Sequence, residues 1–142
     1  AIWDFGSYLM GIPMTQSEMK HRTQRLALRI IRLVESLPGT NTSRILGQQL
    51  LRSGTSVGAN YRAACRAKST ADFIAKLAIV EEEGDESIYW IELLVESKQV
   101  KFQRVENLLD ECNQIVAIVV SAIKTSKQKR NPKSLIPIPK SR

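Results

Sequence analysis

"LRSGTSVGANYRAACRAKS", residues 51–69, is the stretch on which the choice of architecture depends, because its glycines and basic residues suit a helix, a linker or a phosphate loop. Its apolar and small positions continue the series begun by Leu46 and Leu50 with a period close to 3.6 residues, which predicts a helix. A P-loop is excluded, since that motif needs GxxxxGK[ST] between a strand and a helix. We therefore expect Gly54 and Gly58 to let a neighbouring helix approach closely.

Three other segments repeat apolar residues at the same helical spacing. Together with the first stretch they predict helices at 18–37, 43–67, 70–98 and 101–127. The expected N-caps of the first three helices are Ser17, Ser43 and Ser69. Aromatic residues make up only 6% of the chain, while aliphatic residues are plentiful, which favours helices over a β-sandwich. Four long helices with short connections predict an all-α, up-down-up-down four-helix bundle.

The two ends of the chain differ from its middle. Residues 1–16 are expected to be an extension outside the bundle, extended or poorly ordered, because "MTQSEMKHR" from Met14 resembles a natural start. Residues 17–127 make up the expected bundle. Residues 128–142 are basic, contain prolines and carry no acidic residue, which predicts a tail that is disordered by itself.

The 142-residue chain has a formal net charge of +7, and this balance favours an acidic partner such as nucleic acid. No apolar run approaches the roughly 18 residues of a membrane-spanning helix, and the start lacks the basic region of a secretion signal. We therefore expect a cytoplasmic protein with no membrane partner. Cys65 and Cys112 form no metal-binding motif and are expected to be free thiols.

Charge is segregated along the sequence. Residues 36–71 contain five basic residues and no acidic one, whereas the helix expected at 70–98 carries eight acidic residues. The basic face can be a solvated surface, a partner for those acids, or a strip that binds phosphates. Because no aromatic residue is interleaved with these arginines, contacts to the nucleic-acid backbone are the expected binding mode. The candidate binding residues are Arg22, Arg25, Arg29, Arg32, Arg52, Arg62, Arg66, Lys68, Lys127, Lys129 and Arg130.

Catalytic and metal sites find no support in the residue pattern. His21 is the only histidine and has no nucleophile beside it, and the acids of the 70–98 helix lack the histidines of a di-iron site. We expect no cofactor and no enzymatic activity. Gly84 lies at the centre of an apolar face, where it allows close helix packing. Asn60 is expected to make a buried hydrogen bond, and Trp90 is expected either at a second, intersubunit surface or packed within the bundle.

Five ordered motifs resemble the bacterial four-helix bundle proteins first noticed as products of intervening sequences in 23S rRNA genes. The motifs are "QLLRS" (49–53), "SVGAN" (56–60), "STADFI" (69–74), "EGDE" (83–86) and "WIELL" (90–94). With the flanking helices, the resemblance covers about residues 17–125. Two positions depart from the family pattern: Gly58 stands where proline is frequent, and Arg62-Ala63 stand where Glu-Gly is frequent, which makes this helix more basic.

The resemblance implies a bundle that assembles as a ring-like homopentamer. Relatives include basic accessory proteins of diversity-generating retroelements, which bind nucleic acid and partner a reverse transcriptase. The expected function is therefore a non-enzymatic homo-oligomer that binds RNA, DNA or a nucleoprotein partner, a reverse transcriptase among them, through its basic surface. The alternative is a structural or protein-interaction module, whose arginines pair with the acids of the 70–98 helix and which has no nucleic-acid role.

Overall fold

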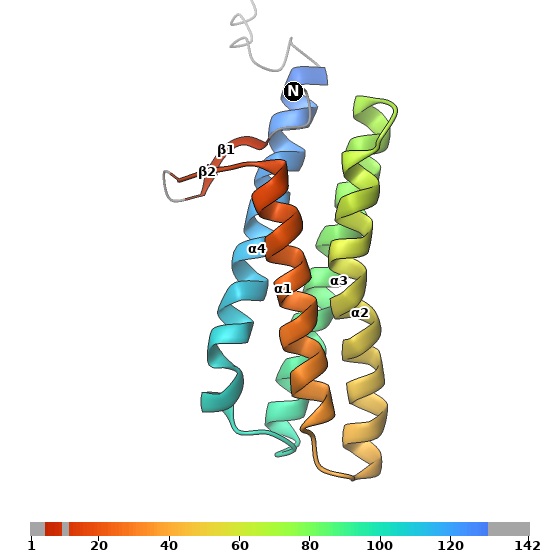
Figure 1. The fold of residues 1–142 in the computed structure, drawn as a ribbon, viewed down its shortest axis with the longest axis vertical. Coiled ribbons are helices and arrows are strands. Elements are labelled where there is room, and N and C mark those ends of the chain that lie inside the picture. The colour runs from red at the N-terminus through yellow and green to blue at the C-terminus, as the bar shows by residue number, and fades with distance from the viewer. Residues whose placement is uncertain (1–4, 10–11, 131–142) are drawn as a thin grey trace, which may run out of the picture.

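The computed structural model describes residues 5–9 and 12–130 of the chain (Figure 1). Four long helices run alternately up and down the molecule. These helices are α1 (Gln16–Glu35), α2 (Asn41–Cys65), α3 (Thr70–Glu96) and α4 (Phe102–Arg130). The predicted all-α, up-down-up-down bundle is confirmed, and every helix boundary lies within a few residues of its expected place.

The first helix starts earlier than its sequence suggests. Thr15, and not Ser17, is the N-cap of α1: its hydroxyl accepts a hydrogen bond from the backbone N–H of Glu18 at 3.1 Å. The Glu18 carboxylate in turn accepts one from the Thr15 backbone N–H at 3.3 Å. This reciprocal capping box satisfies two backbone donors at once, which a cap at Ser17 would leave unpaired.

The N-cap of α2 also lies before the expected start of its helix. Thr40 accepts from the backbone N–H of Ser43 at 3.0 Å, so the prediction of Ser43 as N-cap was wrong. The Ser43 hydroxyl instead donates to Oε1 of Gln99 at 2.8 Å, and so does the Thr40 hydroxyl at 2.5 Å. Gln99 thereby ties the connection between α3 and α4 to the start of α2. The prediction of Ser69 as the N-cap of α3 is confirmed.

The core runs the length of the bundle and draws apolar side chains from all four helices. Leu26 and Ile30 of α1, Leu50 and Val57 of α2, Leu77 and Ile91 of α3, and Val105 and Ile115 of α4 are all fully or almost fully buried. One polar contact crosses the core: the hydroxyl of Ser87 on α3 donates to Ser53 Oγ on α2 at 2.9 Å. Because both hydroxyls are hydrogen-bonded, this small polar pair is buried without an unpaired donor or acceptor.

Glycines set the spacing between neighbouring helices, as the sequence predicted. A Cβ atom at Gly54 on α2 would overlap Ile30 Cδ1 on α1, and one at Gly58 would lie 3.2 Å from Thr23 Oγ1. On α3, a Cβ at Gly84 would lie 2.6 Å from Val116 Cγ2 on α4. At Gly54 and Gly84 an alanine would force the facing side chain to shift, and at Gly58 it would make a tight contact, so each missing side chain allows a neighbouring helix to approach closely.

The residues before α1 form a short hairpin. Strands β1 (Phe5–Leu9) and β2 (Ile12–Met14) pair antiparallel, with Leu9 opposite Ile12. Strand β1 lies beside α4 (Figure 1). The segment expected outside the bundle therefore includes a paired element that contacts the bundle. The predicted tail begins inside α4, which continues to Arg130, and residues 131–142 lie outside the described part of the chain.

The α3–α4 connection has a defined geometry. The backbone N–H of Gln99 donates to Leu94 O and that of Lys98 donates to Val95 O, both at 2.9 Å, which is the hydrogen-bond pair of a Schellman motif. Lys98 occupies the left-handed position of this motif with a φ of 65°. Glycine is the usual residue there because a side chain costs free energy in this conformation, so a lysine is unexpected.

Burial of Cys112 makes the stability of the fold sensitive to alkaline pH. Loss of hydration on burial, with the nearby Glu111 carboxylate as a smaller cause, raises the pKa of the Cys112 thiol to about 12. In the unfolded chain the thiol ionises from its ordinary pKa of 9.0. Its contribution to stability is therefore complete below pH 9 and is lost as the pH rises toward 12.

We expect Cys112→Ala to flatten the pH dependence of the free energy of unfolding between pH 9 and pH 11. The slope removed approaches about 1.4 kcal/mol per pH unit, the value for one proton. Urea unfolding at several pH values measures it, and Cys65→Ala serves as the control because Cys65 is only half-buried. Equal slopes for the wild type and Cys112→Ala would contradict the role of this thiol.

Candidate nucleic-acid interface

Four arginines converge where α1 passes the first turns of α4. Arg25, Arg29 and Arg32 recur at spacings of four and three residues along one side of α1. Arg29 and Arg32 line a shallow hollow of about 250 Å³ together with Arg104 of α4. All three α1 arginines line a second hollow of about 330 Å³ that also includes Leu28 and Glu111. We call Arg25, Arg29, Arg32 and Arg104 the basic groove.

The guanidinium groups of the basic groove are available to a ligand. None of the four makes a hydrogen bond or ion pair with a residue in the described part of the chain. Arg25, Arg32 and Arg104 are exposed and Arg29 is half-buried. Guanidinium groups bind phosphate through two parallel N–H donors and stay charged at all physiological pH values. A row of them at helical spacing suits consecutive phosphates.

Arg22 belongs to the same stripe of α1 but is occupied. Its Nε and Nη2 donate to the two carboxylate oxygens of Glu111 on α4 at 2.8 and 2.7 Å, and Nη2 also donates to Gln114 Oε1 at 2.7 Å. The hydrogen bond to Glu111 raises the pKa of Arg22 further above its ordinary value. This pair neutralises the carboxylate at the edge of the basic groove, so Arg22 acts as an internal partner, and its prediction as a binding residue is not supported.

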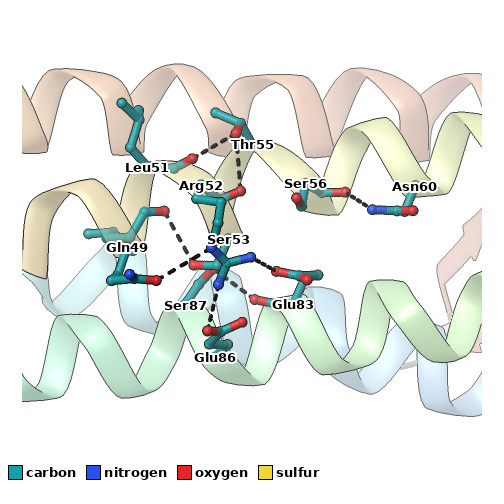
Figure 2. Close-up of polar contacts among 11 residues, drawn as sticks. Gln49, Leu51, Arg52, Ser53, Thr55, Ser56, Asn60, Glu83, Glu86 and Ser87 are labelled. Atoms are coloured by element: carbon teal, nitrogen blue, oxygen red, sulfur yellow. Dashed lines mark hydrogen bonds and ion pairs between the residues drawn. The ribbon is translucent and has the colours of Figure 1, made fainter.

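Arg52 is also engaged within the chain. Figure 2 shows its guanidinium reaching from α2 to two carboxylates on α3, Glu83 at 3.2 Å and Glu86 at 2.5 Å. The hydrogen bond to Glu86 is the largest cause that raises the pKa of Arg52. This contact is the internal pairing that the sequence left open as an alternative. Arg52 therefore acts as an internal partner of α3, and its charge is shared with two carboxylates.

The remaining predicted residues do not join the basic groove. Arg62 donates from Nη2 to Gln24 Oε1 on α1 at 2.9 Å and so lies over the α1–α2 side of the bundle. Arg66 ends α2 and Lys68 lies in the α2–α3 connection. The exposed residues Lys127, Lys129 and Arg130 form the last turn of α4. Figure 1 shows that these two segments share one end of the bundle, opposite the end at which α4 begins.

The surroundings of Asn60 differ from those expected, whereas those of Trp90 match one of its two expected placements. Asn60 is half-buried and donates to the backbone oxygen of Ser56 on its own helix at 2.9 Å (Figure 2), while its neighbour Tyr61 is the fully buried residue. The prediction of a buried Asn60 hydrogen bond was therefore wrong. Trp90 is half-buried against the core and lies beside Tyr89, with ring centroids 5.0 Å apart. Packing within the bundle thus accounts for most of the Trp90 ring.

Sequence reasoning missed Arg104 and the residues before it. Lys98, Lys101 and Arg104 line a hollow of about 820 Å³ at the α3–α4 connection, together with the exposed ring of Phe102. The signal was present in "KQVKFQR" (98–104), where three basic residues surround one aromatic residue. This signal was divided between the end of one expected helix, a short connection and the start of the helix expected at 101–127, so its residues were not considered together.

Metal-binding clusters and membrane-spanning helices are not found among the described residues. Among the residues that the structure describes, no group of three or more His, Cys, Asp or Glu side chains is placed to hold a metal ion. In the same residues, no helix is both long enough and apolar enough to cross a membrane. The basic groove is therefore the arrangement with the clearest chemical capability, which is the binding of anions.

Comparison with known proteins identifies a family and a similar solved structure. A family model described as "23S rRNA-intervening sequence protein" matches residues 15–121. A crystal structure of a protein of unknown function from the S23 ribosomal protein family of Bacteroides thetaiotaomicron is 37% identical, with a TM-score of 0.70, and the match covers 75% of this chain and 98% of that chain. No curated protein matches. The resemblance seen in the five sequence motifs is confirmed.

Proposed function

The chain belongs to the family of 23S rRNA-intervening sequence proteins, and on that premise we propose that it is a non-enzymatic, homo-oligomeric bundle that binds nucleic acid. The contacts would be to phosphates and would carry no base sequence information by themselves. The ligand is an RNA or DNA segment, free or held by a nucleoprotein partner such as a reverse transcriptase. The assembly is the ring-like homopentamer that the family resemblance implies.

The observation that carries this proposal is the basic groove. Its four guanidinium groups have no internal partner among the described residues, whereas Arg22 and Arg52 do. A chain that used arginine only for internal pairing would match each one with a carboxylate. Here the carboxylate nearest to the groove, Glu111, is already held by two donors from Arg22. The groove therefore keeps its positive charge.

Exposed apolar side chains support the oligomeric part of the proposal. Tyr89 is 52% exposed on α3 and Ile45 is 46% exposed on α2. The indole Nε1 of Trp90, next to Tyr89, is buried without a hydrogen-bond partner in the described part of the chain. An unpaired buried donor costs about 1–3 kcal/mol, so the surface around Tyr89 and Trp90 is not optimised as the surface of an isolated chain.

A salt titration of binding tests the proposal. We expect the full-length protein to bind labelled RNA and DNA of unrelated sequences, with log K falling linearly as log salt rises. Four phosphate contacts predict a slope of about −2.8 for single strands and about −3.6 for duplex DNA. Fluorescence anisotropy between about 50 and 200 mM salt measures the slope. Absence of binding at low salt, or binding that ignores salt, would contradict the proposal.

A second function is favoured by the Arg52 contacts. If the chain is a structural or protein-interaction module, pairs such as Arg52 with Glu83 and Glu86 fix helices, and similar pairs join subunits. The same titration separates the two functions. An interaction module would assemble in light scattering and yet show no salt-dependent binding to nucleic acid.

A further inference from the structure

We propose that the hollow at the α3–α4 connection accepts an unpaired base, so that the nucleic acid bound by this protein is single-stranded where it leaves the basic groove. This inference rests on the proposed function, and it names the class of ligand. We call the hollow, lined by Lys98, Lys101, Phe102 and Arg104 among others, the base pocket. An exposed aromatic ring, basic side chains around it and a position next to the basic groove distinguish this pocket.

Phe102 supplies an aromatic surface that the fold leaves uncovered. It is the first residue of α4 and stays 47% exposed, although large apolar residues are normally buried. Aromatic side chains in single-strand binding proteins stack on bases, and the stacking tolerates any sequence because every base has a π-face. A base inside a duplex is already stacked on its neighbours and cannot use this surface.

The charge around Phe102 suits a nucleotide. Three of the residues that line the base pocket are basic, and no carboxylate is among the described residues that line it. Tyr89, which is also well exposed, has the opposite surroundings: Asp85, Glu86 and Glu92 lie three or four positions away on the same helix. A phosphate would be repelled from Tyr89 and attracted to Phe102.

The position of the pocket connects it to the basic groove. Arg104 lines both the base pocket and the hollow formed with Arg29 and Arg32, so the two open side by side. A strand whose phosphates lie along α1 would therefore reach Phe102 at the end of the row. The base pocket, at about 820 Å³, falls within the range of small-ligand sites.

Lys98 adds an independent observation. The left-handed position of the Schellman motif favours glycine, yet the chain places a lysine there, with a φ of 65°. The substitution costs conformational free energy and brings an ammonium group to the rim of the base pocket. Strained residues of this kind gather at binding sites, where the gain in binding compensates for the strain.

The test compares a short single-stranded RNA with a duplex of the same sequence, using the full-length protein. We expect Phe102→Ala to lower the affinity for the single strand by about 10-fold to 100-fold, the effect of losing one stacked base, and to leave duplex affinity unchanged. Ile79→Ala, which removes another exposed apolar side chain, is the control and should change neither. Lys98→Gly relieves the strained position, so it should not lower the melting temperature, and it should reduce the single-strand salt slope by about 0.7.

The outcomes separate this inference from the proposed function. If Phe102→Ala binds the single strand as tightly as the wild type does, and binding still depends on salt, the base pocket is refuted while the proposed function stands. If the wild type binds neither strand, both are refuted. If Phe102→Ala lowers the assembled mass in light scattering without a change in single-strand affinity, Phe102 covers a subunit contact and the inference is overturned.

Discussion

Simultaneous replacement of Arg25, Arg29 and Arg32 by glutamine is expected to lower the affinity for nucleic acid about 100-fold at constant salt. Each guanidinium would lose charge-assisted contacts to phosphate that contribute on the order of 1 kcal/mol. The slope of log K against log salt should become less steep by about two to three units. Because these side chains have no described internal partner, the folded state should lose little stability, which circular dichroism and urea unfolding would verify.

A matched control uses the other exposed basic cluster. Replacement of Lys127, Lys129 and Arg130 by glutamine also removes three positive charges. These charges lie in the last turn of α4, at the opposite end of the helix from Arg104 of the basic groove. We expect this variant to keep most of the affinity, with only the small loss due to the lower net charge. Equal losses in the two triple variants would show that total charge, and not the basic groove, governs binding.

Gly54→Leu is expected to destabilise the fold by about 2–3 kcal/mol, because it overpacks the contact between α1 and α2. The new Cβ would overlap Ile30 Cδ1 and lie 3.1 Å from Ile30 Cγ2, and Ile30 is fully buried in the core. Leucine is a better helix former than glycine by about 1 kcal/mol at an exposed site. The expected loss is the net of both effects.

Urea unfolding measures this change, with Gly39→Leu as the control. Gly39 lies in the α1–α2 turn, and no atom lies within 4 Å of a Cβ built there. The control should therefore stay close to wild-type stability. If Gly54→Leu unfolded at the same urea concentration as Gly39→Leu, the close approach of α1 and α2 at Gly54 would be contradicted.

The fold could be predicted from the sequence because the apolar period is continuous in all four helices. Leu50 and Val57 keep the period through the glycine-containing stretch, and both are fully buried. The caps were harder to predict, because threonine and serine satisfy the same backbone donors and stand two or three residues apart. Thr15 is the N-cap of α1 because it forms reciprocal hydrogen bonds with Glu18. Such a pair depends on side-chain geometry as well as on residue type.

The site could be predicted only in part. The α1 arginines followed from their spacing, but the division between free and paired arginines did not. Arg22 and Glu111 are 89 positions apart, and they meet only because α1 and α4 have one particular register. The helical period likewise could not distinguish Asn60 from Tyr61 on the inward face, since neighbours on a helix differ by only about 100°. Tyr61 is buried because its ring fills more of the core.

The glycines of α2 have a consequence for how a ligand would be received. Gly47 faces Leu37 and Val34, Gly54 faces Ile30, and Gly58 faces Thr23. Side chains of α1, and Leu37 just after it, therefore pack into the spaces that these three glycines leave on α2. The absence of a Cβ at Gly54 and Gly58 lets Ile30 and Thr23 of α1 pack directly against α2. The backbone that carries the α1 arginines is therefore packed against its neighbour before any ligand arrives. We expect most of the ordering on binding to occur in the arginine side chains, which keeps the entropy loss of association small.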